Sequence, residues 1–399
     1  MKKYSDQKGS KTTIIQMLRK HGAITRIELA AITQLSKATI SIAVNELLEL
    51  GLVEELEVMP STGGRPATKL NLTHDSYAVI GVDVNNNEII VTAFDLRGKV
   101  YCSTQLSLTA VDPAFIVQKI REQVDKVTKQ LSCPIIPILG VGITGVVDTA
   151  AGIVRSSAVL GWQQVPLAKL LQEQLGWTIV IVNRSHARGL SECRFGAGEQ
   201  HETIIYIGVD SGIGAGLYIN RELVQGVSGG AGEIGHTTIL LDGPLCACGN
   251  KGCLQMVAST TAMEQDARYW VRQGVESVLQ SYARTDVELL DMPTICKAGN
   301  EGDALASEVI ERAATYVGVT LANMVNILNP DSIIIGGSIA SECPLYIQAA
   351  EKVMRQRAMV QLADRVTVKR GQLDQEGGPL GAITYALDRS VTFAHLYIN

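Results

Sequence analysis

Hydrophobic positions in the first 75 residues recur at helical spacing and predict three short helices. Ile14, Met17 and Leu18 share one face of the first helix. The second helix begins at a capping box, Thr25–Glu28, in which the two side chains can satisfy each other's backbone N–H groups. The third begins at Ser36, a good N-cap residue. The buried stripe of this third helix comprises Ile40, Ala43, Val44, Leu47 and Leu48.

The outer face of the third helix is small or polar, as a helix lying in a DNA major groove requires. The candidate DNA-contacting residues at its start and along this face are Ser36, Lys37, Ala38, Thr39, Ser41 and Asn45. Two alternating segments, Leu52–Val58 and Ala67–Leu72, flank a Gly-rich stretch and predict a two-stranded wing with Arg65 at its tip. An arginine there suits a narrow minor groove. The alternative is a small helical adaptor whose charges are merely solvated.

From residue 76 onward, short apolar strands alternate with amphipathic helices. The predicted strands cover residues 77–84, 88–95, 100–106, 135–143, 178–183 and 332–335, and the predicted helices cover 112–131, 166–175, 185–195 and 304–328. The strand–strand–helix theme begins again at Thr203. We therefore expect an α/β fold with two similar halves that face a central cleft.

Length and composition narrow the class of protein. The chain has 399 residues, 46% of them hydrophobic, which is enough for two or three packed domains. No apolar run approaches the roughly 18 residues that a membrane helix needs, and the polar N-terminus has no signal-peptide core. Residues 1–70 carry ten Lys and Arg against seven Asp and Glu, whereas the remainder carries 25 against 33. This modest bias supports nucleic-acid contact only in the N-terminal segment.

Cysteine usage predicts a metal site rather than disulfides. Three of the eight cysteines form the run C-x-C-x4-C, and the other five are scattered, as is usual for reduced thiols in a cytoplasm. The candidate ligands are His236, Cys246, Cys248 and Cys253, one nitrogen and three sulfurs, which complete a structural Zn²⁺ site. The alternative is three small buried thiols and a surface histidine. Gly249, Asn250 and Gly252 favour zinc, because they predict a tight loop rather than a core strand.

Several runs resemble one known family along nearly the whole chain. LSKATISIAVNELLELGLVEE followed by STGGRPATKL is similar to the winged helix-turn-helix of repressors in the ROK family (repressors, open reading frames and sugar kinases). GVGITGVVD, at residues 140–148, resembles the family's sugar-facing loop. AGEIGHTTI and CACGNKGCLQMVAS resemble its metal and sugar elements, and NPDSIIIGG its distal strand. Family repressors usually carry a basic residue where this chain has Ile42, so the base preference is expected to differ.

The resemblance implies a winged helix-turn-helix domain at residues 1–75 and an actin-like, two-lobed ROK domain at 76–399. Lobe one would comprise about 76–184 plus a C-terminal helix at about 379–399, and lobe two about 185–378. It also implies sugar contacts at Asn183, Glu233 and His236. Gln255 stands where the family has a carboxylate, and its amide keeps an acceptor but adds a donor, which would alter or weaken sugar preference.

Kinase chemistry is absent at two positions of the resemblance. Family kinases have a phosphate cradle similar to D-x-G-G-T-K, but this chain has asparagines in place of both glycines and Glu88 in place of the cation. The kinases' catalytic Asp follows an Asn, and here that residue is Arg184, which cannot act as a base. We therefore expect no catalytic residues. Arg184 would either reach an anionic ligand or pair with a neighbouring carboxylate.

These observations predict a cytoplasmic, sugar-responsive repressor that binds a palindromic double-stranded DNA operator as a homodimer, with pairing into tetramers left open. Structural Zn²⁺ is the expected cofactor, and a sugar or sugar derivative the expected inducer. Two alternatives remain. One is a repressor released by a protein partner, which Gln255 keeps open. The other is an active sugar kinase that also binds DNA, which Arg184 disfavours.

Overall fold

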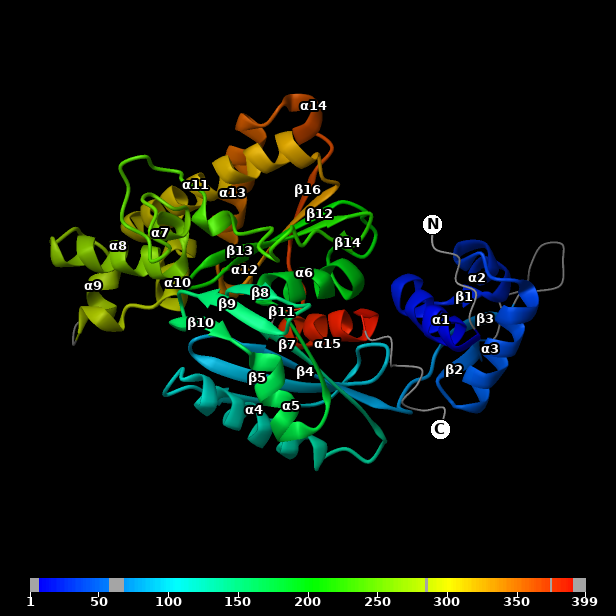
Figure 1. Ribbon diagram of the computed structural model, residues 1–399. Coiled ribbons are helices and arrows are strands. Elements are labelled where there is room, and N and C mark those ends of the chain that lie inside the picture. The colour runs from blue at the N-terminus through cyan, green and yellow to red at the C-terminus, as the bar shows by residue number, and fades with distance from the viewer. Residues whose placement is uncertain (1–6, 57–67, 284–285, 374, 390–399) are drawn as a thin grey trace.

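The computed structural model describes residues 7–56, 68–283, 286–373 and 375–389. A small N-terminal domain stands beside a larger body made of two lobes (Figure 1). Within the described ranges, no helix is both long and apolar enough to cross a bilayer. The predicted wing tip, including Arg65, lies outside the described residues.

Three helices and a three-stranded antiparallel sheet, in the order β1-β3-β2, build the N-terminal domain. Its elements are α1 (Gln7–His21), β1 (Ile24–Thr25), α2 (Arg26–Thr33), α3 (Lys37–Glu49), β2 (Val53–Leu56) and β3 (Lys69–Leu72). The predicted capping box is present, because Thr25 and Glu28 satisfy each other's backbone N–H groups. Ser36 caps α3. Ile40, Ala43, Val44 and Leu47 are buried and Leu48 is half-buried, so the predicted stripe faces the domain core.

Each lobe of the body contains a five-stranded sheet with the same strand arrangement. The first has the order β11-β7-β4-β5-β6 and the second β16-β15-β12-β13-β14. In both, an antiparallel hairpin provides the central strand, and two parallel strands follow beside it. The strands are β4 (Ala78–Val84), β5 (Glu88–Phe94), β6 (Val100–Ser107), β7 (Ile135–Ile143), β11 (Thr178–Asn183), β12 (Ile204–Val209), β13 (Ile213–Ile219), β14 (Glu222–Leu223), β15 (Ser332–Gly336) and β16 (Thr367–Arg370). The expected pair of similar halves is therefore present.

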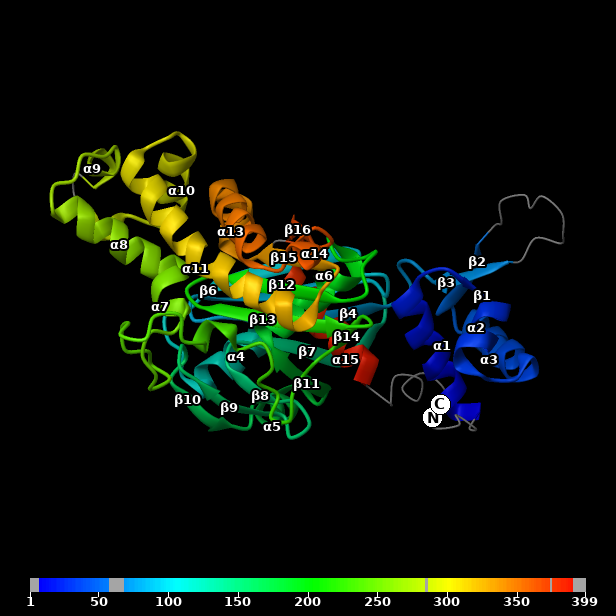
Figure 2. The same cartoon turned by 90° about the horizontal axis from the view of Figure 1, so that it is seen from above.

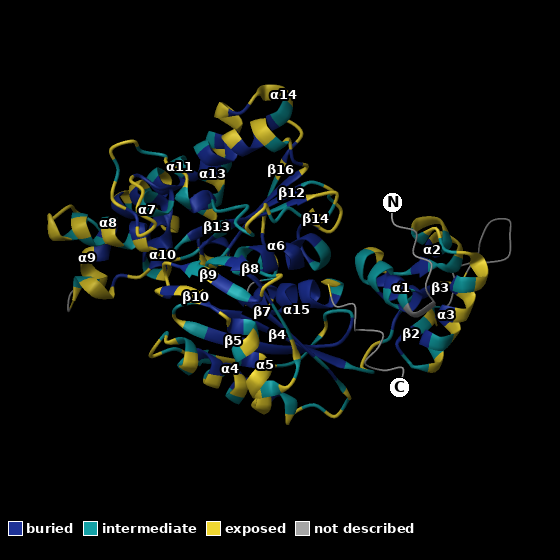
Figure 3. Cartoon of the chain, in the orientation of Figure 1, coloured by how far each residue is buried: buried dark blue, intermediate teal, exposed yellow. Residues whose placement is uncertain are grey.

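Helices cover both sheets, and two of them lie between the lobes. The helices matching those predicted for the body are α4 (Pro113–Thr128), α5 (Leu167–Leu175), α6 (Arg184–Phe195) and α11 (Ala304–Leu328). The C-terminal helix α15 (Gly377–Arg389) packs on β4 and β7 of the first sheet, while α6 packs on β12 and β13 of the second. The two helices also pack on each other and are largely buried (Figure 3). Gly381 permits this close approach, since a Cβ there would lie 1.7 Å from the Ala187 carbonyl oxygen.

The remaining elements extend the two lobes without entering the two main sheets. A small antiparallel sheet, β10-β9-β8, follows β7 in the first lobe. The second lobe carries an extra group of helices, drawn at the left edge of Figure 1. These additional elements are β8 (Val146–Asp148), β9 (Ile153–Ser157), β10 (Trp162–Val165), α7 (Gln255–Ala258), α8 (Thr260–Arg272), α9 (Leu279–Tyr282), α10 (Met292–Asn300), α12 (Ser338–Glu342), α13 (Pro344–Arg357) and α14 (Val360–Ala363).

Candidate functional site

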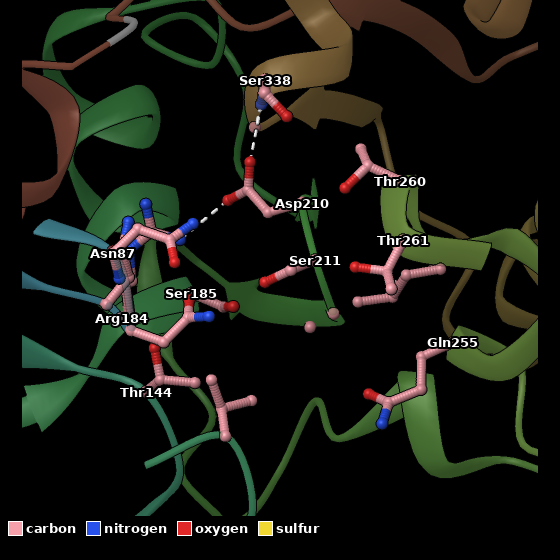
Figure 4. A pocket seen from close by; sticks show the side chains of 18 of the residues that line it. Asn87, Thr144, Arg184, Ser185, Asp210, Ser211, Gln255, Thr260, Thr261 and Ser338 are labelled. Atoms are coloured by element: carbon pink, nitrogen blue, oxygen red, sulfur yellow. Dashed lines mark hydrogen bonds and ion pairs between the residues drawn. The ribbon is translucent and has the colours of Figure 1, made fainter. Parts of the chain in front are cut away.

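A polar cleft of about 570 Å³ lies between the lobes. It is formed by the β4–β5 turn, the β7–β8 loop, the start of α6 and the β12–β13 turn, together with Glu233, His236 and α7. Most of these segments follow the carboxyl ends of strands, where ligands bind in open α/β sheets. In Figure 4, Arg184 and Asp210 stand on one side of the cleft, and Gln255 lies opposite. The cavity is large enough for a small ligand.

Arg184 joins the two lobes through ion pairs. Its Nε lies 3.1 and 3.0 Å from the two carboxylate oxygens of Asp83 on β4, and its Nη1 lies 2.7 Å from Asp210 in the β12–β13 turn. Asp210 also accepts the backbone N–H of Ser338 at 2.7 Å (Figure 4). Of the two roles that the sequence left open for Arg184, pairing with neighbouring carboxylates is the one observed.

Neighbouring charges shift the pKa values of Arg184 and Asp210. Burial and the neighbouring Arg188 would lower the pKa of Arg184, but Asp83 and Asp210 raise it above its ordinary value. Burial alone would raise the pKa of Asp210, yet the charges of Arg184 and Arg188 hold it well below its usual range. A cationic arginine between two carboxylates has no lone pair to accept a proton, so it cannot replace a catalytic base.

The turn that would have to cradle phosphate is closed by its own side chain. Asn85 Oδ1 accepts the backbone N–H groups of Asn87 and Glu88, both at 2.8 Å. In a phosphate cradle, such N–H groups point at the ligand. Here they are already engaged, and the Glu88 carboxylate also lines the cleft. This turn therefore offers no phosphate site of the kinase type.

Two of the predicted sugar-contacting residues hold each other in place. Asn183 Oδ1 caps α6 by accepting the N–H groups of Ser185 and His186. Its Nδ2 donates to the Gly145 carbonyl at 2.8 Å and to Glu233 Oε1 at 3.3 Å. Asn183 thus orients Glu233 and has little capacity left for a ligand. Burial raises the pKa of Glu233, whose second carboxylate oxygen remains beside the cleft.

His236 stands between the cleft and the thiols. Its Nδ1 lies 3.6 Å from Cys246 Sγ, and its Nε2 lies 3.9 Å from Glu233 Oε2. One ring nitrogen can therefore bind a metal while the other faces the cleft. Gln255 also connects the two regions, because it lines the cleft and its Nε2 lies 3.5 Å from Cys246 Sγ. The structure thus brings Asn183, Glu233, His236 and Gln255 together at one end of the cleft.

The ligand atoms of His236, Cys246, Cys248 and Cys253 all lie within 4.8 Å of one another. Two sulfurs bound to one tetrahedral zinc lie about 3.8 Å apart, given Zn–S bonds of about 2.3 Å. The 3.6 Å separation of Cys248 Sγ and Cys253 Sγ is close to this value. The set therefore fits a closed, four-ligand structural site.

Glycines shape the loop that carries the thiols, as the sequence indicated. Gly249 and Gly252 have φ of +92° and +65°, in the left-handed region that favours glycine. A Cβ on Gly252 would lie 1.5 Å from the Leu240 carbonyl oxygen. Two backbone hydrogen bonds complete the tight turn: the Cys246 N–H donates to the Asn250 carbonyl at 2.8 Å, and the Gly249 N–H donates to the Cys246 carbonyl at 2.9 Å. These contacts bring the three thiols onto one side of the loop.

In the N-terminal domain, the predicted DNA face lies on one exposed side of α3. Ser36, Lys37, Ala38, Ser41 and Asn45 are exposed, and Thr39 is half-buried. Within this set Ser36 is committed to capping, since its hydroxyl accepts the Thr39 N–H at 3.1 Å.

Sequence analysis missed a cation beside this face. Arg26, at the start of α2, donates to Asn45 Oδ1 at 3.2 Å and pairs with Glu55 at 3.0 Å. The sequence did contain a signal for this residue, because Arg26 is the first residue of α2, directly after the predicted N-cap Thr25. Glu54 pairs with Arg97 of the body instead, so both acidic residues are neutralised. Arg26 thus lies beside the predicted DNA face, where its charge is balanced by Glu55.

The fold and the site together define a class of protein: a small domain of three helices and a three-stranded sheet, joined to a sugar kinase-like body in which Arg184 pairs with carboxylates across the cleft. The ROK family model matches residues 79–389, and the chain belongs to that family. It is 29% identical to a xylose repressor of Caldicellulosiruptor bescii over 96% of both chains. It is 30% identical to the DNA-binding transcriptional dual regulator NagC of Escherichia coli, over 97% of this chain and 95% of that one.

Two solved structures match different shares of the chain. A ROK family transcriptional regulator, homologous to the E. coli Mlc protein, superposes with a TM-score of 0.82 at 25% identity and covers 98% of this chain and 99% of its own. A ROK glucokinase from Streptomyces griseus covers 77% of this chain and 99% of its own, with a TM-score of 0.72 at 27% identity. The regulators thus match nearly the full length, whereas the kinase matches a smaller share.

Proposed function

We propose that this chain is a transcriptional repressor of carbohydrate genes, in which residues 1–75 bind an operator and residues 76–399 sense a ligand without chemistry. The observation that carries the proposal is Arg184, paired with Asp83 and Asp210 at the position where a kinase needs a base. Full-length similarity to named repressors supports it. So does the exposed, small and polar face of α3.

Operator binding is tested by mobility shift of the purified protein on its own promoter region. Helix-turn-helix dimers bind two half-sites of a symmetric operator, so we infer a homodimer on a palindrome whose half-sites lie about one helical turn, or a multiple of it, apart. Sedimentation with and without operator measures the stoichiometry. Two chains per operator support this proposal, and specific binding by single chains contradicts it.

The inducer is sought by thermal-shift screening against sugars, sugar acids and sugar phosphates. A ligand that binds only the folded state stabilises it by mass action, by about 2.7 kcal/mol at a concentration 100 times the Kd. We expect the hit to depend on Glu233 and Gln255, and to weaken operator binding. A screen without hits would instead favour release by a protein partner.

Absence of kinase activity is measured separately by a coupled ADP assay with every sugar that binds. We expect no turnover above blank, because Arg184 cannot accept a proton and the Asn85 turn presents no phosphate cradle. Robust sugar-dependent ADP release by the unaltered chain would show that the site is catalytic.

Zinc completes the proposal. The three thiolates and His236 Nδ1 would hold the ion and fix the loop beside the cleft, while His236 Nε2 and Gln255 face the ligand. Zinc here supplies folding energy rather than chemistry, since four protein ligands leave no open position. A cytoplasmic location, where thiols stay reduced, remains our prediction.

A further inference from the structure

A second cavity, of about 410 Å³, lies between the N-terminal domain and the body. From the N-terminal domain it is lined by the last turn of α1 and by β3. From the body it is lined by the β5–β6 turn, the end of α6, the loop before β12 and the β13–β14 turn. Figures 1 and 2 place α1 on the side of its domain that faces the body. This cavity is separate from the interlobe cleft, with which it shares no lining residue.

Its lining is rich in cations. These are Arg19, Lys20, Arg97, Arg194 and Arg221, against Glu199 and Glu202. Carboxylates outside the lining neutralise some of them, with Glu222 paired to Lys20 and Glu54 paired to Arg97.

Three of the guanidinium groups are under-compensated. Asp388 is shared by two, at 3.2 Å from Arg19 and 2.6 Å from Arg194. The hydrogen bonds of Arg221 go to backbone carbonyls, including those of Cys193 and His201. Three guanidinium charges thus have one directly bonded carboxylate among the described residues. Glu54, Glu199, Glu202, Glu222 and Asp388 together match the five cations in number, so the cavity is rich in guanidinium donors without a net positive excess.

Two donors in this group lack a partner. Arg19 Nε and Arg194 Nη1 are buried and make no hydrogen bond within the described part of the chain. Their side chains are only 4% and 7% exposed. Unpaired buried donors of charged groups are costly, and they often mark the place of a water or an ion.

The pKa values of the groups around this cavity shift in different directions. Burial would lower the pKa of Arg194, but Asp388 raises it above its ordinary value. Burial lowers the pKa of Arg19 to about 10, in spite of Asp388. Burial and the charges of Lys20, Arg221 and Arg194 lower the pKa of His21. The shifts of Arg19 and His21 are those expected of cations crowded together in a poorly hydrated space.

We propose that this interdomain cavity binds a phosphate-bearing small molecule, held by Arg19 and Lys20 of α1 and by Arg194 and Arg221 of the body. Arginine forks match the oxygens of a phosphate in two hydrogen bonds at once. The volume suits inorganic phosphate or a small phosphate monoester. A duplex backbone is a poor candidate, because a rod of that width cannot reach side chains as enclosed as Arg19 and Arg194.

An anion bound in this cavity would contact both the N-terminal domain and the body. Since the donors come from both sides, the anion holds α1 at one position relative to α6 and the β13–β14 turn. This consequence rests on the proposed repressor function, because it couples the anion to operator affinity. By linkage, operator DNA changes anion affinity by the same factor as the anion changes operator affinity.

Calorimetry on the zinc-loaded, full-length protein tests the site. Inorganic phosphate and glycerol 3-phosphate are titrated at constant ionic strength, with sodium chloride as the balancing salt. We expect saturable binding near one anion per chain, and at least tenfold weaker binding in Arg221→Gln and in Lys20→Gln. Tighter binding of the monoester identifies a phosphorylated metabolite as the source, and equal or weaker binding identifies free phosphate. Lys99→Gln, an exposed control 59% open to solvent, should bind as the unaltered chain does.

Arg194→Gln is the most direct variant, but it removes a buried ion pair and can fail to fold. The phosphate affinities of Arg221→Gln and Lys20→Gln therefore decide whether the proposed site exists. No saturable binding of either probe would overturn the proposal. So would unchanged affinity in both variants, or loss of binding in Gln255→Ala, which would place the anion in the interlobe cleft.

Operator titrations with and without phosphate test the coupling. We expect phosphate to shift the operator Kd of the unaltered protein beyond the shift given by chloride of equal ionic strength, and to have no such effect on Arg221→Gln. Failure of the phosphate effect, with intact operator binding, overturns the coupling alone. Failure of operator binding in phosphate-free and phosphate-containing buffer alike would instead contradict the proposed repressor function.

Discussion

At the scale of single residues, Arg184 stands at the position where a family kinase has its catalytic base, but its contacts are structural. Its guanidinium joins Asp83 of the first lobe to Asp210 of the second. Arg188 pairs with Asp83 as well, at 3.0 Å, so the cluster holds two cations and two carboxylates. Such a network fixes the angle between the lobes only if every member stays paired.

Arg184→Ala should therefore destabilise the protein by about 2 kcal/mol, because it leaves the buried Asp83 with Arg188 alone and Asp210 with only the Ser338 N–H. Urea unfolding measures the change. Arg155→Ala serves as control, since its ion pair with Asp148 is partly exposed and should contribute less than about 1 kcal/mol. Equal effects of the two substitutions would contradict the role assigned to Arg184.

At the scale of elements, the thiol loop and α3 each place several functional side chains through local backbone geometry. In the loop, left-handed glycines turn the chain so that the thiols converge. In α3, the Ser36 cap fixes where the helix starts, and so fixes which residues face outward.

Elemental analysis of the purified protein should find about one zinc per chain. Cys248→Ser should lose the metal and the response to any inducer, because the proposed zinc would supply on the order of 10 kcal/mol of local folding energy to the loop beside the cleft. Cys102→Ser, in β6 and outside the cluster, should keep both. A zinc-free Cys248→Ser protein with full response would show that the metal does not organise the site.

Lys37→Ala should weaken binding to all DNA sequences and reduce the salt slope of log K by about one, as expected for loss of one phosphate contact. Fluorescence anisotropy at several salt concentrations measures both quantities. Lys129→Ala, an exposed lysine at the end of α4 in the body, is the matched control and should leave the slope unchanged. An unchanged slope in Lys37→Ala would place α3 away from the phosphates.

At the scale of the whole molecule, the contact between the N-terminal domain and the body is the route by which the proposed ligand response would reach the proposed DNA face. Asp388, near the end of α15, lies at this contact and accepts from Arg19 of α1 and Arg194 of α6. Gln16 Nε2 also donates to the Asp388 backbone carbonyl at 2.8 Å. Because α15 packs on both the first sheet and α6, a change in lobe angle moves the surface on which α1 rests.

Asp388→Asn should loosen this contact and destabilise the protein by about 3 kcal/mol, since it leaves two buried guanidinium groups without a carboxylate. Limited proteolysis and urea unfolding report the two effects. Asp75→Asn, whose pair with Lys99 is exposed and 3.5 Å long, should change neither. Faster cleavage in both variants would mean that the Asp388 ion pairs do not hold the domains together.

The sequence by itself determined what depends on residues a few positions apart. The capping box at Thr25 and the α3 stripe follow from short-range hydrogen bonds and helical periodicity, and the structure confirms both. The C-x-C-x4-C run with its glycines predicted a four-ligand cluster, and the four ligand atoms do converge. The repeated strand pattern likewise predicted the two similar sheets. In the capping box, the α3 stripe and the ligand cluster, the interaction partners are close along the chain, whereas the paired strands of the sheets are not.

Only the tertiary structure decided contacts between distant segments. Arg184 and Asp83 are 101 residues apart, and the sequence left the role of Arg184 open between a ligand and a carboxylate. The cavity between α1 and the body was not foreseen, because its cations come from four separate segments. Side-chain charge is encoded locally, but the distance that determines its Coulomb energy is set by packing of the whole chain.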